Sequence, residues 1–192
     1  MDKKAVTIDG EDHLLRETAF YISYEEGIVQ DQAIAYNSDN PIEYWNVHMN
    51  GNFIKLRAKE ECMNMFIHDT LFYEMSKADG VELTAEETDY ALVTASDYWE
   101  DLTDYARAGL GISENELTET IFKMAIAQKY QDIYAELNDL DSAELNVGQP
   151  QYEILLNNHK IKINGSVWDG LKFGEITIDQ SGAKKENYEY FK

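Results

Sequence analysis

The side chains that could do chemistry in this sequence are four histidines, one cysteine and several pairs of neighbouring carboxylates. The histidines are His13, His48, His68 and His159, and no two of them stand three or four positions apart. Two histidines need that spacing to share a zinc ion on one face of a helix. The sequence therefore predicts no metal site.

The single cysteine, Cys62, falls within a helical pattern and has no cysteine or histidine partner at a zinc spacing. We interpret it as a small buried apolar residue. Carboxylate pairs such as Glu86 with Glu87 are typical of helix starts and charged surfaces. The chain has neither a glycine loop for phosphate nor a Gly-x-Ser-x-Gly turn. We predict no catalytic residue and no cofactor, although a triad assembled from distant positions stays open.

Aromatic side chains supply the candidate binding residues. The first expected helix has one apolar stripe through Leu15, Ile22 and Val29, and a second stripe of aromatic and aliphatic residues beside it. One stripe is enough to pack a surface helix, so the second needs another partner. Tyrosine and methionine suit surfaces that hold varied apolar segments. The candidate contacts for a client polypeptide are Phe20, Tyr24, Tyr90, Tyr98 and Tyr105. A bundle interior and a homodimer interface remain the alternatives.

Two similar sequence segments mark the places where one helix ends and the next begins. They are Gly80-Val-Glu-Leu-Thr-Ala-Glu-Glu87 and Gly111-Ile-Ser-Glu-Asn-Glu-Leu117. Each opens with a glycine suited to a left-handed helix end, and each then gives a hydroxyl residue followed three positions later by glutamate. The sequence therefore predicts a capping box at Thr84 with Glu87 and another at Ser113 with Glu116.

These signals predict a mainly α fold of four or five helices with a small β element. The long helices are expected at residues 12–37, 52–79, 85–108 and 114–138. After Pro150 the pattern alternates, which predicts short strands at 160–164 and 174–178. A strand at residues 5–8 is expected to pair with this tail and bring the chain ends together. We expect a helical domain over residues 1–145 and a small β-rich closing segment over residues 146–192.

The order of these elements, with Trp45 in a loop and Ala127-Gln-Lys-Tyr130 in the last long helix, resembles the N-terminal chaperone module of extracytoplasmic foldases of the SurA and PrsA type. The resemblance covers roughly residues 5 to 138. It implies a SurA-like helical bundle that binds unfolded or extracytoplasmic client polypeptides, with the family label of peptidyl-prolyl isomerase. Foldases of this type insert a parvulin domain after the fourth helix, and residues 139–150 are too few for one.

We therefore predict client binding without proline isomerisation. The alternatives are a dimeric assembly protein without chaperone activity, and an active peptidyl-prolyl cis-trans isomerase. The resemblance also implies an extracytoplasmic location, at the cell surface or secreted, or as a lipoprotein whose signal is absent from this chain. The first ten residues lack the hydrophobic stretch of a secretion signal.

The net charge of the chain also limits the classes of partner that it can bind. The chain of 192 residues has a net charge of −21, and residues 1–150 hold 10 of its 16 basic and 31 of its 37 acidic residues. Such a surface repels phosphate, so nucleic acid and anionic membranes are poor partners. No run of 18 apolar residues occurs, so we expect a soluble chain that does not insert directly into a membrane.

Overall fold

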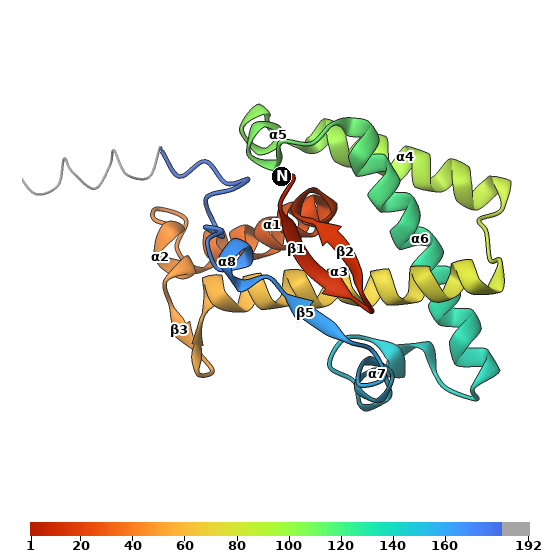
Figure 1. The fold of residues 1–192 in the computed structure, drawn as a ribbon. Coiled ribbons are helices and arrows are strands. Elements are labelled where there is room, and N and C mark those ends of the chain that lie inside the picture. The colour runs from red at the N-terminus through yellow and green to blue at the C-terminus, as the bar shows by residue number, and fades with distance from the viewer. Residues whose placement is uncertain (182–192) are drawn as a thin grey trace, which may run out of the picture.

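A computed structural model describes residues 1–181 and is mainly helical, as the sequence predicts. Its frame consists of four long helices: α1 (Ala19–Tyr36), α3 (Ile54–Asp79), α4 (Ala85–Asp101) and α6 (Glu114–Leu137). Helix α3 runs through the middle of the molecule, α6 crosses it, and α4 packs along α6 (Figure 1). No helix of the described part is long and apolar enough to span a bilayer.

The other elements are short. They are β1 (Lys4–Ile8), β2 (Glu11–Leu14), η1 (Leu15–Thr18), α2 (Ile42–Trp45), β3 (His48–Met49), β4 (Asn52–Phe53), α5 (Asp104–Leu110), η2 (Ser142–Leu145), α7 (Pro150–Leu156), β5 (Ile161–Ile163) and α8 (Gly165–Trp168). Of the expected closing segment, residues 182–192 lie outside the described residues.

Both predicted capping boxes are confirmed. Gly80 and Gly111 end α3 and α5 at φ values of +69° and +59°. The Thr84 hydroxyl accepts a hydrogen bond from the Glu87 amide at 3.2 Å, and the Glu87 carboxylate accepts from the Thr84 amide at 2.7 Å. Ser113 and Glu116 pair in the same way. Each box satisfies two amides that the first turn of a helix cannot satisfy.

The β element formed by the chain ends is also confirmed. Strand β1 lies between β2 and β5 and is antiparallel to both, with Val6 opposite Ile163. The sheet lies beside α3 in Figure 1. Ala5, Val6 and Ile8 are buried in a core shared with α1 and α3, so the sheet closes one side of the helical frame.

The helix expected at residues 12–37 begins later than predicted. Asp9 and Gly10 have φ values of +50° and +93°, and the chain turns there into the hairpin of β1 and β2. Asp-Gly favours such a tight turn, and this signal outweighs the helical spacing of the residues that follow. A second hairpin turns at Asn50 and Gly51 and delays the start of α3 to Ile54.

The helix expected at residues 85–108 is divided. Leu102 takes an extended conformation with ψ of 132°, and the Thr103 hydroxyl then accepts a hydrogen bond from the Ala106 amide at 3.1 Å. This N-cap starts α5 in a new direction. The prediction of one continuous helix was therefore wrong, because the apolar spacing continues across a break that Thr103 stabilises.

The strand expected at residues 174–178 does not form, and Pro150 begins helix α7, where an alternating pattern was expected. The amides of Gly174, Ile176 and Thr177 instead donate hydrogen bonds to the buried carboxylate of Glu26. A side chain from a distant helix thus takes the place of a partner strand. Of the tail up to residue 181, only β5 is a strand.

Two hydrophobic clusters hold the elements together. The first joins α1, α3 and β1 and takes Trp168 and Phe173 from the tail. The second lies between α3, α6 and α7 and centres on Phe72, Tyr130 and Tyr152. The tail therefore contributes side chains to both clusters. Cys62 is fully buried in the first cluster, as predicted, and burial raises its pKa well above the ordinary value.

Candidate functional site

A cavity of about 620 Å³ opens between α1, α3, α6 and the segment that follows η2. We call it the central groove. Its lining combines aromatic, thioether, imidazole, carboxylate and amide groups. These are Phe20, Tyr21, Tyr24, Met65, His68, Asp69, Met124, Gln128, Gln131, Asn146 and Val147.

Helical spacing places these side chains on facing surfaces. Phe20 and Tyr24 are four residues apart on α1, and so are Met124 and Gln128 on α6. Residues at that spacing lie one above the other on a helix. The groove is therefore a product of helix packing, and rigid elements position most of its wall.

Three of the five predicted binding residues gather at one place. The rings of Phe20 and Tyr24 stack with centroids 5.8 Å apart, and the Tyr98 ring lies 5.1 Å from Phe20. The Tyr98 and Ser23 hydroxyls share a hydrogen bond of 2.8 Å. Burial raises the pKa of Tyr98 to about 12, so its hydroxyl is neutral at physiological pH. Phe20 is buried, whereas Tyr24 is 44% exposed at the groove.

Tyr90 and Tyr105 lie elsewhere. Tyr90 is 75% exposed on α4 and does not line the groove. The Tyr105 hydroxyl, on α5, donates a hydrogen bond of 2.9 Å to the carbonyl of Glu175. The structure thus separates these two tyrosines from the cluster of Phe20, Tyr24 and Tyr98.

A chain of buried polar groups crosses one wall of the groove. The Tyr21 hydroxyl donates to Asp69 Oδ2 at 2.9 Å, and His68 Nδ1 lies 2.8 Å from Asp69 Oδ1. His68 Nε2 lies 3.1 Å from the carbonyl oxygen of Leu145. Each ring nitrogen of His68 therefore faces an oxygen that accepts hydrogen bonds. The chain ties α1, α3 and η2 together.

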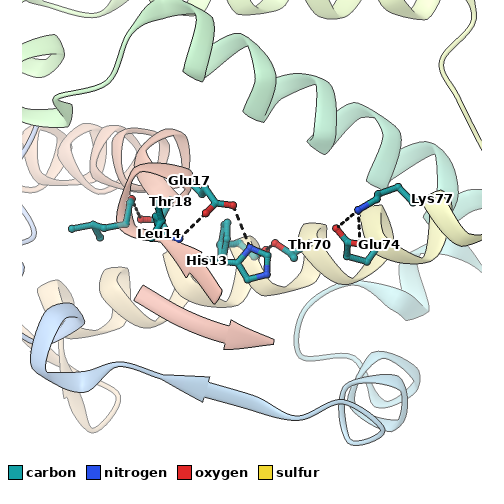
Figure 2. A network of polar contacts seen from close by, with 9 residues as sticks. His13, Leu14, Glu17, Thr18, Thr70, Glu74 and Lys77 are labelled. Carbon is teal, nitrogen blue, oxygen red and sulfur yellow. Dashed lines mark hydrogen bonds and ion pairs between the residues drawn. The ribbon is translucent and has the colours of Figure 1, made fainter. Parts of the chain in front are cut away.

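A second, smaller cavity of about 160 Å³ shares Tyr21 and Asp69 with the groove. Figure 2 shows some of its polar groups, among them His13, Glu17, Glu74 and Lys77. Glu17 accepts a hydrogen bond from the Leu14 amide at 2.6 Å and lies 3.2 Å from His13 Nδ1, while Lys77 donates to both oxygens of Glu74.

Burial raises the pKa of Glu17, but the hydrogen bonds with His13 and the Leu14 amide outweigh burial and bring the pKa below its ordinary value. Its carboxylate is therefore ionised and fully engaged. Glu74, on the same cavity, forms an ion pair with Lys77 at 2.8 Å. Within residues 1–181, no three His, Cys, Asp or Glu side chains are placed to hold a metal ion.

Gln131, which is not among the residues predicted from the sequence, fixes the far wall of the groove. Gln131 Nε2 donates to the carbonyl of Ser142 at 2.8 Å and to Asn146 Oδ1 at 2.9 Å. The sequence does contain a signal for this role, because Gln131 lies between Ala127 and Ala135 at the four-residue spacing of the buried face of α6. A polar residue inside an apolar stripe indicates a buried hydrogen-bonding group.

The raised pKa of Glu25, on α1, makes the stability of the fold depend on pH. Burial and the neighbouring Glu61 raise its pKa to about 7, against the opposing effect of Arg57. The folded state therefore binds more protons than the unfolded state between roughly pH 4.5 and 7, and stability falls as the pH rises through that window. In the parent chain, the free energy of unfolding should therefore be lower at pH 7.5 than at pH 5. Glu25→Gln is expected to reduce this difference by about 1–2 kcal/mol, as measured by urea unfolding at the two pH values.

Asp31 provides the matched control, since it is an exposed carboxylate of the same helix. Asp31→Asn should leave the difference between the two pH values as it is in the parent chain. An unchanged pH dependence in Glu25→Gln would show that Glu25 is solvated and carries an ordinary pKa.

A scan against protein-family models finds no match, and searches of curated proteins and of solved structures find none either.

Proposed function

We propose that this chain binds extended segments of unfolded polypeptides in the central groove, as a chaperone or foldase-like protein that does not isomerise proline bonds. The observation that supports this best is the lining of the groove, which places aromatic, thioether and side-chain amide groups around one cavity of about 620 Å³. Peptide recognition needs apolar contacts for side chains and hydrogen bonds for the backbone at the same place.

The apolar contacts come from Phe20, Tyr24, Met65 and Met124. Methionine has an unbranched, polarizable side chain that adapts to different shapes, and it packs well against aromatic rings. Tyrosine adds a large apolar face with a polar end. These groups accept a range of apolar or aromatic client residues without demanding one shape.

The hydrogen bonds come from amide side chains. Gln128 is exposed on α6. Its side-chain amide forms no hydrogen bond with another described residue, so the amide nitrogen and oxygen are both available to a client. Asn146 accepts from Gln131 and keeps its own amide donors. An amide can pair with the N–H and C=O groups of an extended backbone whatever the client sequence.

The negative charge of the chain is expected to favour some client polypeptides over others. The net charge of −21 opposes phosphate-bearing partners and favours polypeptides with basic residues beside their apolar segments. The interval between α6 and α7 contains only η2 and short turns, so no isomerase domain is inserted there. We place such a protein outside the cytoplasm, where the foldases that it resembles meet unfolded clients.

The test is a binding measurement on two variants. A fluorescently labelled, permanently unfolded basic polypeptide is titrated with the chain, and fluorescence anisotropy gives the dissociation constant. Tyr24→Ser combined with Met124→Ser is expected to weaken binding about tenfold, because both side chains are contacts within the cavity. Suppression of the aggregation of a denatured protein by an equimolar amount of chain should fall in parallel.

Tyr90→Ser is the matched control, since it removes an exposed tyrosine far from the groove. Its affinity should equal that of the parent chain. Equal losses in the control and in the groove variant would place the client elsewhere. A dimer whose mass is independent of concentration, together with no client binding, would favour a dedicated assembly protein.

A further inference from the structure

The segment of residues 171–177, which we call the strap, lies against α1, α2, α3 and α5. It is part of the blue chain that leaves α8 in Figure 1. Its anchor is Glu26, a fully buried carboxylate on α1. Glu26 Oε1 accepts from the amides of Gly174 at 2.5 Å and Ile176 at 3.3 Å, and Oε2 accepts from the amide and hydroxyl of Thr177 at 2.6 and 2.5 Å.

No lysine, arginine or histidine in residues 1–181 forms an ion pair with Glu26. A buried charge is costly unless hydrogen bonds replace its water. The four donors of the strap take this role, and their arrangement around the carboxylate is that of a backbone anion nest. The sequence already hints at this, because Glu26 stands among Ile22, Val29 and Ala33 on the buried face of α1.

Shape adds specificity to these hydrogen bonds. Gly174 packs on the indole of Trp45 so closely that a Cβ atom at Gly174 would come within 2.7 Å of the ring. Gly109 of α5 faces the carbonyl of Ile176, and the Tyr105 hydroxyl donates to the carbonyl of Glu175. The strap is thus bound as a receptor binds a peptide, with main-chain hydrogen bonds and close steric selection.

The receptor side of this contact comes from residues far from the strap in sequence. Glu26, Trp45, Tyr105 and Gly109, which we call the strap site, all precede it by more than sixty positions. The strap is joined to α8 by Asp169 and Gly170, and Lys59 Nζ of α3 donates hydrogen bonds to the carbonyls of Asp169 and Leu171 at 3.0 and 2.8 Å. None of the contacts between strap and strap site depends on the two belonging to one chain.

We propose that the strap site also accepts the strap of a second copy, so that two chains form a homodimer by reciprocal exchange. Such a dimer preserves every contact described above and needs no new complementary surface. The chain's own strap competes at a high effective concentration, so exchange is favoured only at high protein concentration. This inference is independent of the proposed binding of clients in the central groove.

The test uses two full-length variants that complement each other. Glu26→Gln damages the site and keeps the strap, because its amide group turns two donors toward the donors of the strap. Gly174→Ala damages the strap and keeps the site, because its Cβ meets Trp45 and its φ of +89° disfavours alanine. Light scattering after size exclusion should show each variant as a monomer and their equimolar mixture as a heterodimer.

The association of the mixture is expected to be at least about tenfold tighter than that of either variant alone, as one restored set of charged hydrogen bonds implies. The matched control mixes Gly174→Ala with a chain that carries both substitutions, and this mixture should stay monomeric. A monomeric test mixture of two variants that are folded by circular dichroism would overturn the proposal.

If either variant fails to fold, parent chains labelled with donor and acceptor dyes replace them. They are incubated together at millimolar concentration and then diluted. Energy transfer that persists after dilution and decays slowly is the expected result, and its absence would equally overturn the proposal.

Discussion

His68→Ala is expected to lower the free energy of unfolding by about 3 kcal/mol, because it removes buried hydrogen bonds and leaves the Asp69 carboxylate without one of its partners. Asp69 would keep only its hydrogen bond from Tyr21, and the carbonyl of Leu145 would lose its donor. The ring also packs against Phe72 and Tyr152 at centroid distances of 4.8 and 5.0 Å, so its removal leaves a cavity. Urea unfolding at pH 7 measures the loss.

A second readout separates this effect from general destabilisation. His68 holds η2, and the residues directly after η2 form one wall of the central groove. Hydrogen exchange at the amides of residues 143–147 should therefore accelerate more than exchange in α4.

His159→Ala is the control for His68→Ala, since His159 forms a more exposed pair with Asp9 at 2.6 Å. Exposed pairs contribute little, so the expected loss is below about 1 kcal/mol. Equal losses in the two variants would mean that the chain of hydrogen bonds through Asp69 has no special role in stability.

Gly109→Ala is expected to reduce the free energy of unfolding by about 2–3 kcal/mol. An added Cβ atom would overlap the backbone carbonyl oxygen of Ile176. Because both sides of this contact are fixed to backbone, no rotamer change can relieve it, and α5 and the strap must separate. Urea unfolding gives the loss, and limited proteolysis after Lys172 reports whether the strap has left its site.

Gly27→Ala provides a close comparison, because Gly27 is also helical and has no atom within 4 Å of a built Cβ. Alanine is the better helix former by roughly 0.5–1 kcal/mol, so this variant should gain stability by about that amount. A loss in Gly27→Ala, or no loss in Gly109→Ala, would contradict the packing described for α1 and α5.

The sequence was most informative where structure is decided by neighbouring residues. Thr84 with Glu87 and Ser113 with Glu116 specify helix starts through bonds within a single turn, and the structure places both as predicted. The pairing of the chain ends also follows from pattern, because alternating residues near both termini need a partner strand. Where two local signals compete, as at Asp9 and Gly10, the turn signal outweighs the helical spacing.

Contacts between distant residues could not be predicted in this way. The tail at residues 174–177 has the composition of a strand, and nothing local indicates that Glu26 will bind its amides. Likewise, Tyr98 belongs to the same expected helix as Tyr90 and Tyr105, and only the break at Leu102 and the packing of α4 against Phe20 set it apart from them. Tertiary geometry decides such questions after each helix has formed.

The pairing of β1 with β5 has a consequence for the order of folding during synthesis. The edge of β1 that pairs with Ile161–Ile163 is synthesised first, and its partner emerges more than 150 residues later. The helices of the frame interact mostly over shorter separations and can assemble before that time. A nascent chain therefore carries an unpaired strand edge until β5 leaves the ribosome, and chains truncated before β5 cannot complete the sheet.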